Sequence, residues 1–285
     1  MKYKLHIIII ILSVLQFNVK AAQNYAFFSG ESQNIEIQLT KSKGMPFVWN
    51  LKFKHRTITE GDGIVDISGN ASIDISIPAA KPGIVIETTL TIMTKSEKLS
   101  IPAKIYSSNP FGGREPDMKT LYLLDNSDNG SVEKFLKIHK IKYIRINNIK
   151  AFNVKKGLLI VAGLRMESHP GVPESLIKAT EPDNRIICFL PAGSELKFNA
   201  SHIKSISSIE AGTNTRERLQ YTRDAFVTIS NKATGGGCNE LDIPVGKGNI
   251  YIYPHTSISE MKKSPVMLYS FAEKFFNKKM KGKLK

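Results

Sequence analysis

Apolar and polar residues alternate along much of residues 23–106. A period of two places every second side chain on one face of a strand, as in a sheet that is buried on one side. Gly- and Pro-containing turns are predicted at 61–63 and 81–83. The predicted strands are 34–39, 47–53, 64–67, 72–77, 84–93 and 99–106. Short strands with regular turn signals are typical of an all-β sandwich, and the alternation around Trp49 predicts a core position for its ring.

The pattern changes at residues 107–117, a predicted linker that is rich in Pro, Gly and Ser and has no period. Residues 118–278 then contain nearly continuous apolar runs, which are typical of parallel strands buried on both faces. The predicted strands are 120–124, 143–146, 157–162, 185–190, 225–229 and 249–253, and helices are predicted to begin near Ser131, Pro173 and Ser264. This alternation predicts a three-layer α/β domain with a mainly parallel sheet.

Residues 1–21 have the three parts of a signal peptide. Lys2 and Lys4 precede an apolar run that begins at Ile7, and small residues close the segment. The run is shorter than the roughly 20 residues that span a bilayer. We therefore expect an exported protein, in the periplasm, on the cell surface or outside the cell, whose mature chain has no transmembrane segment. An uncleaved signal anchor is the alternative.

The formal net charge is +15, of which three lysines leave with residues 1–21, so that the mature chain carries +12. The basic residues are spread except for a tail at 279–285, which we interpret as solvated. Adhesion of this tail to an anionic envelope or an acidic polysaccharide is the alternative. Nucleic acid is not expected as a partner, because the tail lacks stacking aromatics. An envelope polysaccharide or another exported protein remains the partner to consider.

Two cysteines are present, Cys188 in an apolar strand and Cys238 after three glycines. Whether they form a disulfide stays open, because sequence does not give the separation of their Cα atoms. No metal or cofactor is predicted. The histidines lack the spacing of metal ligands, and the glycines before Cys238 lack the Lys-Ser/Thr of a phosphate-binding loop.

Four segments together resemble a known architecture of exported bacterial proteins: 121–125, 157–163, 246–252 and 264–276. In their order and spacing the chain resembles an immunoglobulin-like sandwich followed by a degenerate class I glutamine amidotransferase-like domain. The resemblance covers residues 118–278 and implies an amidotransferase-like or flavodoxin-like sheet. It also implies a scaffold that accompanies carbohydrate-related proteins.

The departures from that family concern its catalytic residues. Working members carry a Cys in a Gly-x-Cys-x-Gly elbow and a later His-x-Glu pair, whereas residues 190–194 here are Leu-Pro-Ala-Gly-Ser and His255 has Ser257 two positions on. No catalytic residue is therefore carried over. We expect an exported binding or scaffold protein without catalysis, linked to carbohydrate or cell-envelope processes. The alternative is a secreted hydrolase acting on a glycan or amide, with Ser194 or Cys188 as nucleophile.

Open α/β sheets bind ligands beyond the carboxyl ends of their strands. The residues predicted to border such a pocket are Asp125, Asn126, Gly163, Leu164, Arg165 and Ser194. The alternative is that residues 125–130 form only a polar loop and helix cap. The same segment departs from a calcium-binding EF-hand loop, since its twelfth position is Leu136 where a Glu is needed.

Overall fold

The computed structural model describes residues 24–112, 120–127, 129–165, 171–180, 183–199, 205–210, 213–218, 226–230 and 240–276. The predicted signal peptide and the basic tail lie outside these residues, as does Cys238. The chain divides into two compact units. The first comprises Met1–Tyr25, Glu36–Ile73 and Glu87–Lys104, and the second comprises Ala26–Ile35, Asp74–Ile86 and Ile105–Lys285.

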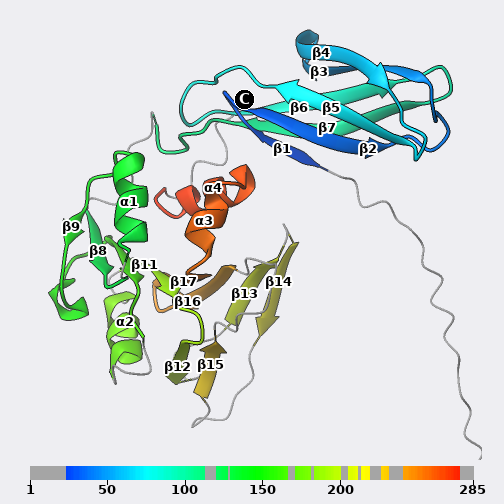
Figure 1. Ribbon diagram of the computed structural model, residues 1–285. Coiled ribbons are helices and arrows are strands. Elements are labelled where there is room, and N and C mark those ends of the chain that lie inside the picture. The colour runs from blue at the N-terminus through cyan, green and yellow to red at the C-terminus, as the bar shows by residue number, and fades with distance from the viewer. Residues whose placement is uncertain are drawn as a thin grey trace, which may run out of the picture. The chain divides into compact units, whose positions relative to one another are not determined.

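The strands between residues 25 and 106 form a five-stranded sheet, in the order β1-β7-β6-β3-β4, and a two-stranded sheet of β2 and β5 (Figure 1). They are β1 (Tyr25–Phe28), β2 (Ser32–Gln38), β3 (Pro46–Phe53), β4 (Arg56–Ile64), β5 (Asn70–Ser76), β6 (Val85–Met93) and β7 (Lys98–Tyr106). Buried and exposed residues alternate along β3, β5, β6 and β7, as the sequence pattern predicts. Trp49 is buried, which confirms its predicted place in the core.

The predicted turn at Gly61–Gly63 is wrong, because these residues lie inside strand β4. In the antiparallel register, Gly61 stands opposite Trp49 and Gly63 opposite Phe47. A Cβ on Gly61 would lie 2.9 Å from Trp49 Nε1, and one on Gly63 would lie 2.7 Å from Phe47 Cζ. The two glycines therefore leave room for aromatic rings that lie across the strand, and they do not mark a change of direction.

An eight-stranded sheet organises the second unit, in the order β14-β13-β16-β17-β11-β10-β8-β9. Its parallel part is β9 (Ile144–Arg145), β8 (Leu121–Asp125), β10 (Leu158–Ala162), β11 (Arg185–Leu190) and β17 (Gly248–Pro254). Its antiparallel part is β16 (Glu240–Val245), β13 (Ser205–Glu210) and β14 (Thr213–Arg218). A separate pair consists of β12 (Glu195–Asn199) and β15 (Phe226–Ser230).

Both faces of the parallel part are buried. Alternate residues of β10 belong to two different hydrophobic clusters: Leu159 and Val161 to one, and Leu158 and Ile160 to the other. Helix α2 (Val172–Thr180) and the short helix η1 (Ile149–Ala151) cover the first face, and α1 (Ser131–Ile138), α3 (Ser257–Met261) and α4 (Pro265–Glu273) cover the second. The continuous apolar runs in the sequence reflect this burial on both sides.

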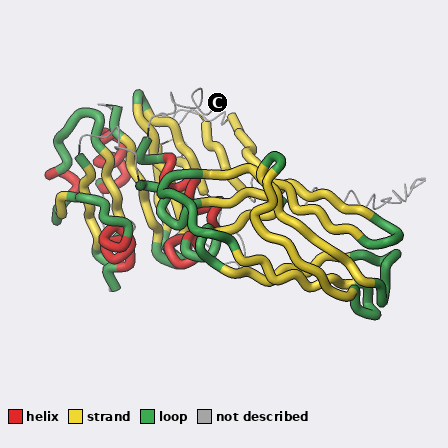
Figure 2. The backbone as a smooth tube through the Cα atoms, turned by 90° about the horizontal axis from the view of Figure 1, so that it is seen from above, coloured by secondary structure: helices red, strands yellow, loops and turns green. Residues whose placement is uncertain are grey.

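The prediction of a three-layer α/β domain is nevertheless wrong. The described part of the structure is mostly β with few helices, and strands dominate Figure 2. The short connections between strands explain why the prediction and the structure differ. Only residues 246–247 join β16 to β17, and only 191–194 join β11 to β12. A crossover between parallel strands needs a dozen or more residues, so these links can form only hairpins or turns.

The helix starts differ in how they are capped. Ser264 accepts a hydrogen bond from Met267 N and is followed by a proline, as the sequence predicts. Ser131 is not the N-cap of α1, because Gly130 takes that position in a left-handed conformation and Ser131 is the first helical residue. The hydroxyl of Ser131 is thereby left available for another contact. No helix among the described residues is long and apolar enough to cross a membrane.

His139 follows the last turn of α1 and packs between aromatic rings. Its ring centroid lies 4.5 Å from that of Phe135 and 5.3 Å from that of Phe111, and burial lowers its pKa. Because the folded state disfavours the protonated imidazole, this packing stabilises the fold above the ordinary histidine pKa of about 6.5, and the contribution is lost as the pH falls below it. We expect the melting temperature of the wild type to fall more than that of His139→Leu between about pH 7.5 and 5.5. Equal falls in both proteins would contradict this.

Candidate functional site

The carboxyl ends of four parallel strands meet at one edge of the sheet. Ala162, the last residue of β10, stands opposite Asp125 on β8 and Phe189 on β11, and Leu190 stands opposite Pro254 on β17. The residues that follow are held by backbone hydrogen bonds: Asn126 N donates to Ala162 O, and His255 N donates to Leu190 O, each at 2.9 Å. This edge, called the strand-end edge below, is where open sheets of parallel strands bind ligands.

Asp125 organises the loop at this edge. Its Oδ1 accepts hydrogen bonds from Ser127 N (3.0 Å) and Ser127 Oγ (2.5 Å), and its Oδ2 accepts one from Glu133 N (3.2 Å). Asp125 therefore performs the capping of α1 that Ser131 does not, with a charged acceptor at the helix N-terminus. Both carboxylate oxygens accept hydrogen bonds within the protein and Asp125 is only 5% exposed, so Asp125 shapes the edge from within and does not face a ligand.

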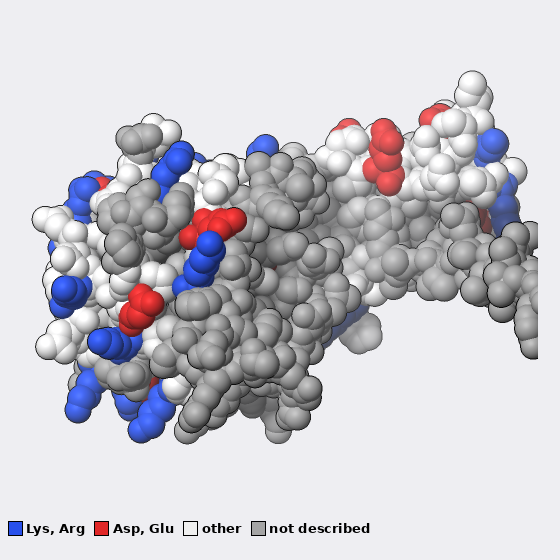
Figure 3. Space-filling model, turned by 90° about the horizontal axis from the view of Figure 1, so that it is seen from below, with Lys and Arg blue, Asp and Glu red and all other residues white. Residues whose placement is uncertain are grey.

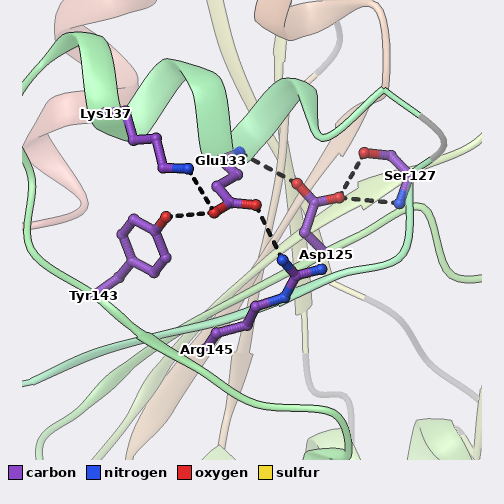
Figure 4. Close-up of polar contacts among 6 residues, drawn as sticks. All are labelled: Asp125, Ser127, Glu133, Lys137, Tyr143 and Arg145. Atoms are coloured by element: carbon purple, nitrogen blue, oxygen red, sulfur yellow. Dashed lines mark hydrogen bonds and ion pairs between the residues drawn. The ribbon is translucent and has the colours of Figure 1, made fainter.

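Glu133, in the first turn of α1, joins that helix to the neighbouring strand. It accepts hydrogen bonds from Tyr143 OH (2.7 Å) and Arg145 Nη1 (3.2 Å), and Lys137 Nζ lies 2.9 Å away (Figure 4). The hydrogen bond from Tyr143 and the Lys137 ammonium lower the pKa of Glu133, while the same contact raises the pKa of Lys137. This exposed network fixes the direction of α1, and hence the position of Ser131.

Gly163 brings two loops of the strand-end edge into contact. Its φ is +69°, and a Cβ at this position would lie 2.1 Å from Ser127 N. Leu164, next in the chain, is buried in a hydrophobic cluster, whereas Asn126 and Arg165 are exposed. Of these four predicted site residues, Asn126 and Arg165 can therefore reach a ligand, Gly163 acts through its backbone, and Leu164 belongs to the core.

The remaining candidates, Ser194 and Cys188, are fully buried. Cys188 is a free thiol, and burial raises its pKa to about 12, so that a reactive thiolate is strongly disfavoured. Ser194 Oγ has no hydrogen-bond partner among the described residues. The turn before Ser194 leads into strand β12 and not into a helix, so the geometry of a nucleophile elbow is absent at this point. Neither side chain is placed to attack a substrate.

Ser131 and His255 form a polar contact that the sequence did not reveal. Ser131 Oγ lies 3.4 Å from His255 Nε2, although 124 positions separate them in the chain. Both residues are half-buried, and both lie next to the strand-end edge. The position of His255, two residues after the predicted strand 249–253, was the available signal. Its partner could not be identified, because strand order and the path of α1 are not visible in the sequence.

Among the described residues, no group of three His, Cys, Asp or Glu side chains is arranged to hold a metal ion. On the face drawn in Figure 3, the described Lys and Arg side chains are scattered among acidic and uncharged ones.

No family model matches the sequence, and no curated protein matches it. Among solved structures, a carbohydrate acetylesterase from Xanthomonas citri is 8% identical with a TM-score of 0.21, over 37% of this chain and 19% of that one. The extracellular domain of mouse leukocyte-associated immunoglobulin-like receptor 1 is 14% identical with a TM-score of 0.22, over 36% of this chain and all of that one. A Bacteroides ovatus protein of a mixed-linkage glucan utilization locus, solved with a heptasaccharide, is 9% identical with a TM-score of 0.17, over 80% of this chain and 41% of that one. Likenesses this weak establish neither fold nor function.

Proposed function

We propose that this is an exported binding protein whose second unit holds a hydroxyl-rich ligand, with an envelope polysaccharide as the first candidate. Export rests on the signal-peptide pattern of residues 1–21. The observation that carries the binding role is the meeting of Ser131 and His255 at the strand-end edge. A hydroxyl and an imidazole both donate and accept hydrogen bonds, which suits them to sugar hydroxyls.

At the N-terminus of α1 the local charge favours an uncharged ligand group. The N-terminus of α1 would otherwise attract an anion, but the Asp125 carboxylate already occupies it. The exposed Asn126 amide adds another donor and acceptor beside Gly163. Beside the exposed Arg165, the edge thus presents neutral polar groups of the kind that fix the orientation of a carbohydrate. The family resemblance is consistent with such a role, although the chain lacks the residues for amidotransfer.

Binding can be tested with the mature chain, a glycan array and calorimetry on the glycans retained. His255→Ala and Asn126→Ala are each expected to weaken binding about 3- to 10-fold, because each removes one neutral hydrogen-bonding group. Asn153→Ala is the matched control, since Asn153 is also exposed but precedes β10 at the opposite edge. The proposal fails if no glycan binds, or if the Asn126→Ala and Asn153→Ala variants bind glycans with the same affinity.

A further inference from the structure

We propose that Ser131 and His255 also form a nucleophile–base pair that cleaves acyl esters. The pair lies at the strand-end edge where the proposed ligand binds, so the reaction rests on the proposed function and is additional to binding. It assigns the role of nucleophile to a residue other than Ser194 or Cys188, which are buried out of reach of substrate.

The local structure prepares Ser131 for this role. A serine at a helix start ordinarily uses its hydroxyl to cap a backbone N–H. Here Gly130 is the N-cap, and Asp125 Oδ2 accepts the Glu133 N–H. The only hydrogen-bond partner of Ser131 Oγ among the described residues is His255 Nε2. The hydroxyl is thus released from the usual structural task and directed to a general base.

His255 is positioned by the sheet. It follows Pro254 at the end of β17, and its N–H donates to Leu190 O on the adjacent strand at 2.9 Å. The distance of 3.4 Å between Ser131 Oγ and His255 Nε2 is longer than the 2.6–3.2 Å of an engaged pair, as is common before a substrate is bound. Both side chains are half-buried, so a ligand at the edge can reach them.

The reaction proceeds in two balanced steps. Ser131 Oγ attacks the ester carbonyl carbon while His255 Nε2 takes the hydroxyl proton; the tetrahedral intermediate expels the alcohol, which receives that proton from His255. Water then attacks the acyl-serine while His255 takes a proton from it, and collapse releases the carboxylic acid and returns the proton to Ser131. No other reactant is consumed.

The missing third member of a triad limits the substrate class. No carboxylate among the described residues hydrogen-bonds to His255, and loss of that function costs about 10⁴-fold in kcat in a full triad. Cleavage of an amide needs the full triad, because an amine is a poorer leaving group than an alcohol. The pair is therefore assigned to esters, and on a hydroxyl-rich ligand these are O-acyl groups.

The test treats the full mature chain with a fluorophosphonate probe and identifies the labelled peptide by mass spectrometry. We expect the adduct on Ser131, together with hydrolysis of p-nitrophenyl acetate. Ser131→Ala is expected to abolish both, and His255→Ala to slow hydrolysis about 10²-fold or more, with partial rescue by added imidazole. Ser175→Ala, which removes another half-buried serine, in the first turn of α2, serves as the control and is expected to behave like the wild type.

Labelling at another serine, no labelling of the wild type, or equal hydrolysis by Ser131→Ala would overturn this assignment. The wild-type adduct does not depend on whether any variant folds. If glycans bind but Ser131 is not labelled, only the reaction is refuted. If Ser131 is labelled but no glycan binds, the proposed ligand is refuted and the pair stands.

Discussion

Replacing Lys274 with Met is expected to lower the free energy of unfolding by about 3–5 kcal/mol, the usual cost of removing one partner of a buried ion pair. Lys274 Nζ forms a salt bridge with Glu240 Oε1, and the two side chains are only 12% and 7% exposed. The ammonium also lies 4.5 Å from the ring centroid of Tyr251. Without it, the Glu240 carboxylate would remain buried beside the hydroxyls of Ser270 and Tyr253 with no cation to balance its charge.

Urea unfolding followed by circular dichroism measures this loss. Lys197→Met is the matched control, because Lys197 pairs with Glu195 at 3.6 Å on the surface and should change stability by less than about 1 kcal/mol. The double variant Glu240→Leu with Lys274→Met should be more stable than Lys274→Met alone, since it leaves no unpaired charge. Lys274 directly follows α4. If the Lys274→Met protein were as stable as the Lys197→Met protein, the ion pair between Lys274 and Glu240 would contribute nothing to holding α4 in place.

The sequence predicted the elements wherever one short-range period decided them. The strands at 120–124, 157–162 and 185–190 correspond to β8, β10 and β11 within one residue at each end. Each is buried on both faces, so nothing distant had to be known to recognise it. The helix start at Ser264 was equally local, because a capping serine followed by proline is a complete signal in itself.

Prediction failed where a distant residue decides the structure. Gly61 and Gly63 resemble a turn until pairing with β3 places Trp49 and Phe47 across them. The three-layer α/β prediction failed similarly, because it assumed a helix after each strand where short connections form hairpins and turns. For the site, chain order located the strand-end edge. The approach of Ser131 to His255 depends on strand order and on how α1 crosses the sheet, and no local pattern encodes either.

Gly163→Ala is expected to destabilise the second unit by about 2–4 kcal/mol and to displace the loop that carries Asn126. Two physical effects add at this position. A φ of +69° is strained for any residue with a Cβ, at about 1–2 kcal/mol, and the new methyl group would lie 2.1 Å from Ser127 N. The neighbour is backbone and cannot rotate away. The loop must therefore move, which would disturb the hydrogen bonds of Ser127 to Asp125 and with them the cap of α1.

Gly193→Ala separates the two effects. Gly193 has a similar φ of +74°, but a Cβ there would meet nothing within 4 Å, so only the backbone strain of about 1–2 kcal/mol is expected. Urea unfolding compares the two variants, and amide chemical shifts of Asn126 and Ser127 report whether the loop has moved. If both variants lose the same stability and leave those shifts unchanged, the two loops do not touch, and the strand-end edge lacks the contact that holds its ligand-facing groups in place. If only Gly163→Ala moves the loop, Ser131 in this variant should also react more slowly with fluorophosphonate, because the position of Ser131 depends on the cap that Asp125 forms on α1.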